Sequence, residues 1–126
     1  MNTLSLPKAY LLTKKSEYNN VYQHGKRVYG ENFSLILVPN NVRRNRLGIS
    51  IHGQLKGAAK RNRIKRIIRE FFRLNKRFLQ EQSSTSCEFP YMDIVITVRK
   101  GFSLEKPADV ARAVNCLLES SGPLFQ

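Results

Sequence analysis

The stretch KGAAKRNRIKRIIREFFRLNKR, residues 56–77, decides the fold, because only one of its two sides can be buried. It holds ten Lys or Arg and one acidic residue, Glu70. At about 100° per residue along a helix, its apolar residues share one side: Ile64, Ile67, Ile68 and Phe71, followed by Phe78. The other side carries Asn62, Arg66, Arg69 and Arg73, flanked by Lys65 and Lys76 on one edge and by Arg63 and Arg77 on the other. The pattern predicts an amphipathic helix from Gly57 or Ala58 to Gln80.

The polar side of this helix carries charges of one sign. Lys65 and Arg69 stand four residues apart, as do Arg69 and Arg73, and such like-charged pairs repel. A helix that only needs to be soluble usually mixes the two signs, so the pattern favours an anionic partner over a merely solvated face. Arginine suits that partner because its planar fork grips phosphate and stacks on bases. Asn62 could contact a base edge or a ribose hydroxyl, or orient its arginine neighbours.

The whole chain shares this bias. It has 126 residues, the size of one domain, and a formal net charge of +13. RNA, DNA, an anionic membrane and acidic protein tails are all compatible partners. Its two cysteines, Cys87 and Cys116, are far apart, which is typical of reduced thiols in a cytoplasmic protein. We expect neither a membrane span nor a secretory signal.

The remaining patterns predict a layered fold. A short helix is expected over residues 14–23, capped by Thr13 or Ser16, with aromatic and aliphatic residues on one face. Alternating runs predict strands at 33–38, 47–51 and 92–98, and Phe33, Leu35 and Leu37 are assigned to the core. Another helix is expected from Pro107 to a point before Gly122. Residues 1–12 are expected to form an extended arm and 80–90 a flexible loop. The order predicts a single-domain α/β sandwich over residues 1–126.

Several functions fit this chain less well. A protein-only nuclease needs clustered carboxylates, and the nine acidic residues here are scattered, with only Asp93 inside a predicted core strand. His24 and His52 have no metal-ligand spacing with the cysteines. A DNA-binding regulator would need a two-helix reading unit or a dimer seam. A membrane-surface protein fits least well, because the predicted sheet covers the apolar side of the helix. A structural RNA-binding protein, such as a ribosomal protein, stays the strongest alternative.

The run Lys60-Arg61-Asn62-Arg63-Ile64-Lys65-Arg66-Ile67-Ile68-Arg69-Glu70 resembles the signature helix of the bacterial ribonuclease P protein component. The resemblance covers roughly residues 8–120. It includes residues 11–18, 21–22 and 24–25 of the first helix, residues 46–50, and residues 93–96 followed by 99–101. One departure is His52-Gly53-Gln54, where the family usually has a Lys-Lys pair. Lys56 could replace part of that charge.

The resemblance implies a four-stranded sheet, three helices and a left-handed β-α-β crossover. It also implies that a catalytic RNA subunit, with Mg²⁺ held in the holoenzyme, removes the 5′ leader of precursor tRNA, while the protein is inert alone and binds no metal. The expected partners are that RNA and precursor tRNA, with no DNA and no membrane. Eight residues would dock on the RNA: Lys60, Arg61, Asn62, Arg63, Lys65, Arg66, Arg69 and Arg73. Five would line a leader cleft: Lys14, Tyr18, Tyr22, Ser34 and Ile36.

The two tyrosines have a second interpretation. Without the resemblance, ordinary core packing would be favoured for Tyr18 and Tyr22. Their hydroxyls weigh against it, since a buried tyrosine usually needs a hydrogen-bond partner. Exposed aromatic rings suit unpaired bases of any sequence, because each stacked base contributes about 1–3 kcal/mol.

Overall fold

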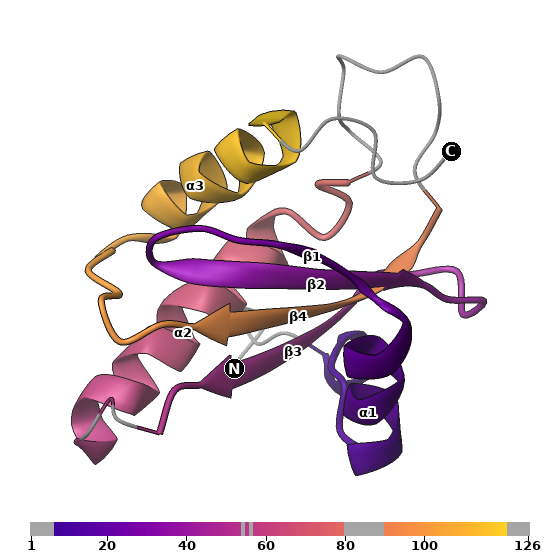
Figure 1. The fold of residues 1–126 in the computed structure, drawn as a ribbon, viewed down its shortest axis with the longest axis horizontal. Coiled ribbons are helices and arrows are strands. Elements are labelled where there is room, and N and C mark those ends of the chain that lie inside the picture. The colour runs from indigo at the N-terminus through magenta and orange to yellow at the C-terminus, as the bar shows by residue number, and fades with distance from the viewer. Residues whose placement is uncertain (1–6, 54, 56, 80–89, 121–126) are drawn as a thin grey trace.

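A computed structural model describes residues 7–53, 55, 57–79 and 90–120. Its elements follow the chain in a simple order (Figure 1). They are a 3₁₀ turn η1 (Lys8–Tyr10), α1 (Lys15–His24), β1 (Lys26–Val28), β2 (Phe33–Pro39), β3 (Arg46–Ile51), α2 (Ala58–Leu74), β4 (Met92–Val98) and α3 (Pro107–Ser120). The predicted α+β architecture of three helices and one four-stranded sheet is therefore confirmed.

The sheet is mixed, in the order β1-β2-β4-β3. β2 pairs antiparallel with β1 and β4, whereas β3 and β4 are parallel neighbours joined through α2. In Figure 1 both parallel strands run from right to left, β4 lies above β3, and α2 passes behind them. This β3-α2-β4 crossover is left-handed, against the usual rule for such units.

The two faces of the sheet bury different clusters, because successive strand residues point to opposite sides. Phe33, Leu35 and Leu37 of β2 are buried in the larger cluster with α2 and α3, as predicted. Ile36 and Val38 point the other way and are buried in a smaller cluster with Val21 of α1. The described helices thus form two layers around the sheet, with α1 on one face and α2 and α3 on the other.

Helix α2 is shorter than predicted. It ends at Leu74, and the helical pattern does not continue to Gln80. The Asn75 side chain donates to the Phe71 carbonyl at 2.9 Å, which satisfies an acceptor at the helix end. The following turn still brings Phe78 into the core against Phe71, with ring centroids 5.4 Å apart. Phe78 therefore joins the apolar side through a turn instead of through helical periodicity.

The N-terminal segment also differs from the prediction. Lys8–Tyr10 form a 3₁₀ turn where an extended arm was expected. Leu11 then bridges to Leu47, and the Leu12 N–H donates to the Leu47 carbonyl at 2.8 Å. Backbone from this segment thus covers the outer edge of β3, which would otherwise be an open strand edge. Residues 1–6, and 80–89 of the predicted loop, lie outside the described residues.

Two smaller corrections concern the first helix and the strand after it. Neither Thr13 nor Ser16 caps α1; the Glu17 carboxylate accepts the backbone N–H groups of Thr13 and Lys14, each at 2.9 Å. β1, three residues that follow α1 almost directly, was not predicted from the sequence. A strand that short shows too little alternation to be recognised.

Packing of the α2 apolar side should dominate stability. We predict that Ile68→Ala, at a fully buried position, lowers the free energy of unfolding by about 2–5 kcal/mol, because it leaves a cavity. Leu74→Ala is the matched control, since Leu74 is 60% exposed on the same helix and should change stability by less than about 0.5 kcal/mol. Urea unfolding measures both. Equal losses would contradict the assignment of this side to the core.

Candidate RNA-binding surfaces

The solvent side of α2 is a concentrated cationic surface. We call it the basic face of α2 and define it by six residues: Lys60, Asn62, Arg63, Lys65, Arg66 and Arg69. All are exposed except Lys65, which is half-buried. Within the described part of the chain, none of its five cations forms an ion pair. Either burial of the apolar side of the helix or a bound anion must therefore offset the repulsion among these cations.

Two other predicted docking residues have partners within the protein. Arg61 donates from its guanidinium to the Leu55 carbonyl at 3.1 Å and, more weakly, to the His52 carbonyl at 3.5 Å, which ties the segment before α2 to the helix. Arg73 pairs with Glu70, one turn away. Hydrogen bonding between the two lowers the pKa of Glu70 and raises that of Arg73. Arg61 thus fixes the segment that contains Leu55, and Glu70 neutralises part of the charge of Arg73.

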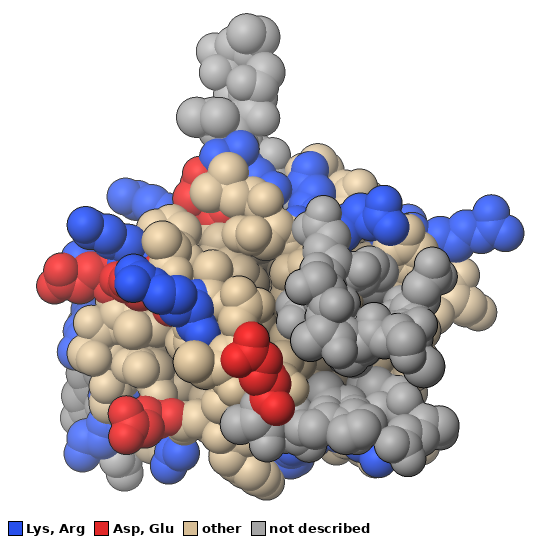
Figure 2. Space-filling model, turned by 90° about the horizontal axis from the view of Figure 1, so that it is seen from above, with Lys and Arg blue, Asp and Glu red and all other residues tan. Residues whose placement is uncertain are grey.

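The α3 side of the molecule has a different charge pattern. Figure 2 looks down on this side and shows carboxylates among uncharged residues, with basic side chains mainly around the rim. On α3 itself, Arg112 donates to Asp109 at 2.8 Å. A surface that mixes both signs in this way attracts a polyanion less than the basic face of α2 does.

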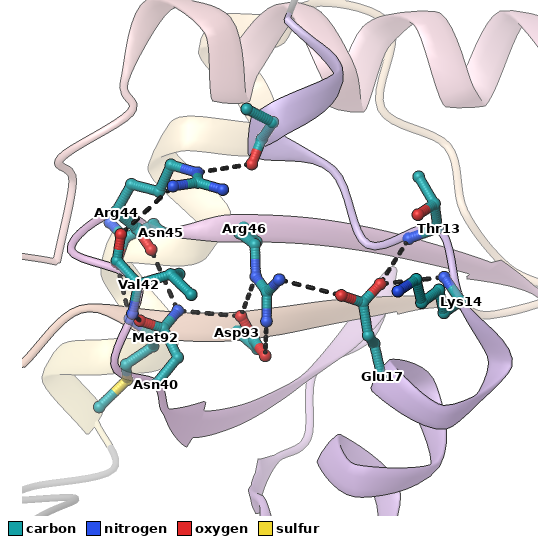
Figure 3. A network of polar contacts seen from close by, with 11 residues as sticks. Thr13, Lys14, Glu17, Asn40, Val42, Arg44, Asn45, Arg46, Met92 and Asp93 are labelled. Carbon is teal, nitrogen blue, oxygen red and sulfur yellow. Dashed lines mark hydrogen bonds and ion pairs between the residues drawn. The ribbon is translucent and has the colours of Figure 1, made fainter.

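The opposite face of the sheet is organised by a polar network that starts at Arg46 (Figure 3). Arg46 opens β3 and donates two hydrogen bonds to the Asp93 carboxylate of β4, each at 2.8 Å. A third, at 2.9 Å, goes to the Glu17 carboxylate of α1. One guanidinium thus joins two strands to the N-terminal turn of α1, where Glu17 also caps the helix. These contacts fix where α1 begins above the sheet.

Two asparagines extend this network into the loop between β2 and β3. The Asn40 side chain donates to Asp93 at 2.9 Å and to the Arg44 carbonyl at 3.0 Å. Asn45 is buried, and its side-chain oxygen accepts the Met92 N–H at 3.0 Å. This role of Asp93 was not predicted, although a carboxylate inside a buried strand needs a cationic or donor partner. The arginine at the start of the preceding strand, Arg46, is the sequence signal for that partner.

The predicted leader residues on α1 are Lys14, Tyr18 and Tyr22. Lys14 is exposed at the start of the helix, and the tyrosines are half-buried with ring centroids 6.4 Å apart. The Tyr18 hydroxyl accepts the Ile49 N–H at 3.3 Å, and its ring leaves no room for a Cβ at Gly48, which would lie 2.7 Å from Cε1. Tyr18 therefore also packs on β3, whereas the Tyr22 hydroxyl makes no hydrogen bond to any residue that the structure describes.

The two leader residues predicted on β2 lie deeper. Ile36 is fully buried below α1, so its side chain supports the helix in this conformation, and Ser34 is almost as buried. Ser34 stands opposite Thr97 of β4, and Thr97 stands opposite Ser50 of β3. Three hydroxyl residues thus form a row across the sheet on the α1 side. The Thr97 hydroxyl oxygen is buried and has no hydrogen-bond partner among the described residues.

Neither metal-binding nor membrane-spanning geometry is found in the described ranges. No three His, Cys, Asp or Glu side chains come together there as possible metal ligands. No helix in the same ranges is long and apolar enough to cross a bilayer. The candidate RNA-binding surfaces of the described chain are the basic face of α2 and the α1 side of the sheet.

These features define a class: a small α+β protein that presents one cationic helix on a left-handed β-α-β unit. Solved structures of that class match closely. A Staphylococcus aureus RNase P protein has a TM-score of 0.72 and 25% identity, covering 94% of this chain and 100% of that one. A Thermotoga maritima RNase P protein has a TM-score of 0.68 and 26% identity, and the match covers 86% of this chain and 94% of that one.

Sequence comparison identifies the family. The family model described as Ribonuclease P matches residues 6–122. The ribonuclease P protein component of Desulfotalea psychrophila is 44% identical over 117 residues, 93% of this chain and 90% of the relative. That of Syntrophus aciditrophicus is 41% identical over 119 residues, which cover 94% of this chain and 92% of the relative. The chain belongs to the ribonuclease P protein family, and membership implies a general role in tRNA processing.

The network at Glu17 predicts an acid-sensitive contribution to stability. Backbone hydrogen bonds from Lys14 and Thr13, helped by the Arg46 charge, hold the pKa of Glu17 below its ordinary value of 4.5. The carboxylate therefore stabilises the fold at pH values above about 4.5, and this contribution is lost as pH falls through the lowered pKa. Glu17→Gln should cost about 0.5–2 kcal/mol at pH 7, the range for helix caps, and much less at pH 3.

Urea unfolding at both pH values measures this difference. Glu31→Gln is the control, because Glu31 is an exposed carboxylate outside the network. A Glu17→Gln cost that is the same at pH 3 and pH 7 would show that the charge of Glu17 contributes nothing.

Proposed function

We propose that this chain is the protein subunit of a ribonuclease P in which it binds a catalytic RNA and the 5′ leader of precursor tRNA. In that assembly it assists Mg²⁺-dependent endonucleolytic removal of the leader, which produces the mature 5′ end of the tRNA. The observation that carries the proposal is the basic face of α2: five cations without an ion pair in the described chain, on a helix whose other side is buried.

The basic face of α2 is assigned to the catalytic RNA. Its arginines project from a rigid helix, which suits them to grip phosphates in a fixed spacing. Asn62 lies among them and supplies both a donor and an acceptor for a base edge or a ribose hydroxyl. Arg61 and Arg73 join this surface if RNA phosphates replace their present partners, the Leu55 carbonyl and Glu70.

The α1 side of the sheet is assigned to the leader. Tyr18 and Tyr22 offer ring faces to unpaired bases, and such stacking accepts any sequence. Lys14 supplies a charge at the start of α1. Ser34 belongs to the hydroxyl row described above, and Ser50 continues that row next to Gly48, which the Tyr18 ring covers. Ile36 supports this surface from below instead of touching the leader.

The cleavage chemistry is assigned to the RNA subunit, which would hold the Mg²⁺ ions that activate the attacking water. The contribution of the protein is electrostatic and positional. It reduces repulsion where RNA strands meet, and it holds the leader so that the scissile phosphate reaches the catalytic RNA.

Docking by α2 can be tested by removing its charges. We predict that Arg66→Ala and Arg69→Ala each weaken assembly with a bacterial ribonuclease P RNA, because each removes a phosphate partner. Each should also make the slope of log affinity against log salt shallower by about 0.7–0.9. Arg112→Ala removes the same charge from α3, where Arg112 already pairs with Asp109, and should change both much less.

Filter binding over a salt series gives both quantities, and thermal unfolding confirms that the variants are folded. If the two α2 variants bind as tightly as the parent, or if Arg112→Ala is equally weakened, docking does not use this helix.

Leader binding can be tested at Tyr22. We predict that Tyr22→Ala in the holoenzyme weakens precursor tRNA binding about 5- to 100-fold more than mature tRNA binding, because one stacked base loses its partner. Tyr22 is preferred to Tyr18, whose hydroxyl also contacts β3. Tyr29→Ala is the matched control, since Tyr29 is 69% exposed beyond the end of β1. Equal weakening for both tRNAs would return Tyr22 to a packing role.

A further inference from the structure

A hollow of about 310 Å³ lies between the first half of α2 and the segment before α3. Its lining is Lys60, Arg63, Ile64 and Ile67 from the helix, with Phe102, Ser103, Leu104 and Glu105 opposite. Pockets that hold small ligands begin at roughly 300 Å³, so it suits one flat ring system and is too small for a helix.

The lining separates into an apolar interior and a charged rim. Ile64, Ile67 and Phe102 are buried residues of the main core, and Leu104 packs partly against it. Lys60 and Arg63 are exposed on one side of the rim, and Glu105 is exposed on the other. Glu105 forms no ion pair with either cation, although all three side chains line the same hollow. A hollow with a small apolar floor, a mostly polar opening, cations on one edge and a carboxylate on the other matches a nucleotide.

The far wall of the hollow is held in place by the rest of the fold. The Ser103 N–H donates to the Asn32 side chain at 2.9 Å, and the Phe102 N–H donates to the Arg99 carbonyl at 3.1 Å. The Phe102 ring also packs near Phe33 of β2, with centroids 6.4 Å apart. The site is therefore largely formed before any ligand arrives, which lowers the ordering cost of binding.

We propose that this hollow receives one unpaired base, bearing an exocyclic amino group, from the RNA that docks on the basic face of α2. The inference rests on the proposed function, because Lys60 and Arg63 belong both to that face and to the rim of the hollow. An RNA strand that crosses Arg66 and Arg63 reaches the opening directly. The two cations then hold the flanking phosphates, and the base enters between Ile67 and Leu104.

Glu105 gives the site its preference among bases. A carboxylate accepts hydrogen bonds only, so it pairs with the exocyclic amino group of cytosine, adenine or guanine. Uracil is disfavoured because its single donor, N3–H, lies between two carbonyl oxygens that the carboxylate repels. The same carboxylate repels phosphate, which orients the nucleotide with its backbone towards Lys60 and Arg63. A fully cationic rim would bind backbone in either orientation.

The test is dimethyl sulfate probing of a bacterial ribonuclease P RNA, which reports unpaired adenine and cytosine, combined with a carbodiimide reagent for guanine and uracil. Hydroxyl-radical cleavage of the same complexes reports the RNA backbone on α2. We expect the wild-type protein to protect one unpaired adenine, cytosine or guanine beside the backbone footprint. Leu104→Ala removes a wall of the hollow and should restore reactivity of that base about 5-fold or more, as truncation of an important contact side chain does at an interface. Glu105→Gln, at an exposed position, should restore part of it.

Leu117→Ala is the matched control, because Leu117 is another partly buried leucine of the main core. It should leave the base protected. A backbone footprint without a protected base, or a base that stays protected in both hollow variants, would overturn this inference and leave the proposed function standing. Loss of protection in Leu117→Ala to the same degree as in Leu104→Ala would also overturn it. Absence of any backbone footprint would instead contradict the proposed function itself.

Discussion

Burial of the apolar side of α2 against the sheet is the constraint on which the other features depend. Ile64, Ile67, Ile68 and Phe71 are enclosed by strands on one side and by α3 on another. With that side fixed, the rotation of the helix is fixed as well, and Arg66 and Arg69 must face solvent. The core therefore places like charges close together, and its burial energy offsets their repulsion. Binding of RNA, as proposed, would relieve that repulsion and so raise the stability of the fold.

On the other face of the sheet, Arg46 fixes the position of α1. It satisfies the buried Asp93 carboxylate and also holds Glu17, so that α1 is fastened at its first turn. Replacing water around Asp93 by a guanidinium fork is favourable only when the geometry is good, and here both carboxylate oxygens are used. The consequence is positional, since the tyrosines proposed to stack on the leader are carried by the helix that this network holds.

Residue patterns predicted the two sides of α2 well, because the spacing of apolar residues along a helix indicates which side is buried. The patterns failed where a turn follows the helix. Phe78 fits the apolar side of α2 by its spacing, but the helix ends at Leu74, and Phe78 reaches the core through the turn after Asn75. They also failed for β1, which is too short to alternate. The predicted RNA-docking residues came from the charge of the helix and from the family resemblance. Neither reveals that Arg61 donates to the Leu55 carbonyl or that Arg73 pairs with Glu70. Contacts between distant segments, such as Arg46 with Glu17, required the fold.

In the proposed function, this chain enables a catalytic RNA to cleave precursor tRNA and cuts no RNA itself. The most direct measurement is cleavage of precursor tRNA at low Mg²⁺ by a bacterial ribonuclease P RNA, with the protein, without it, and with the protein alone. We predict cleavage at the mature 5′ end only when RNA and protein are both present. Tight RNA binding that gives no gain in cleavage would contradict the account and favour a structural RNA-binding protein, and cleavage by the protein alone would contradict it outright.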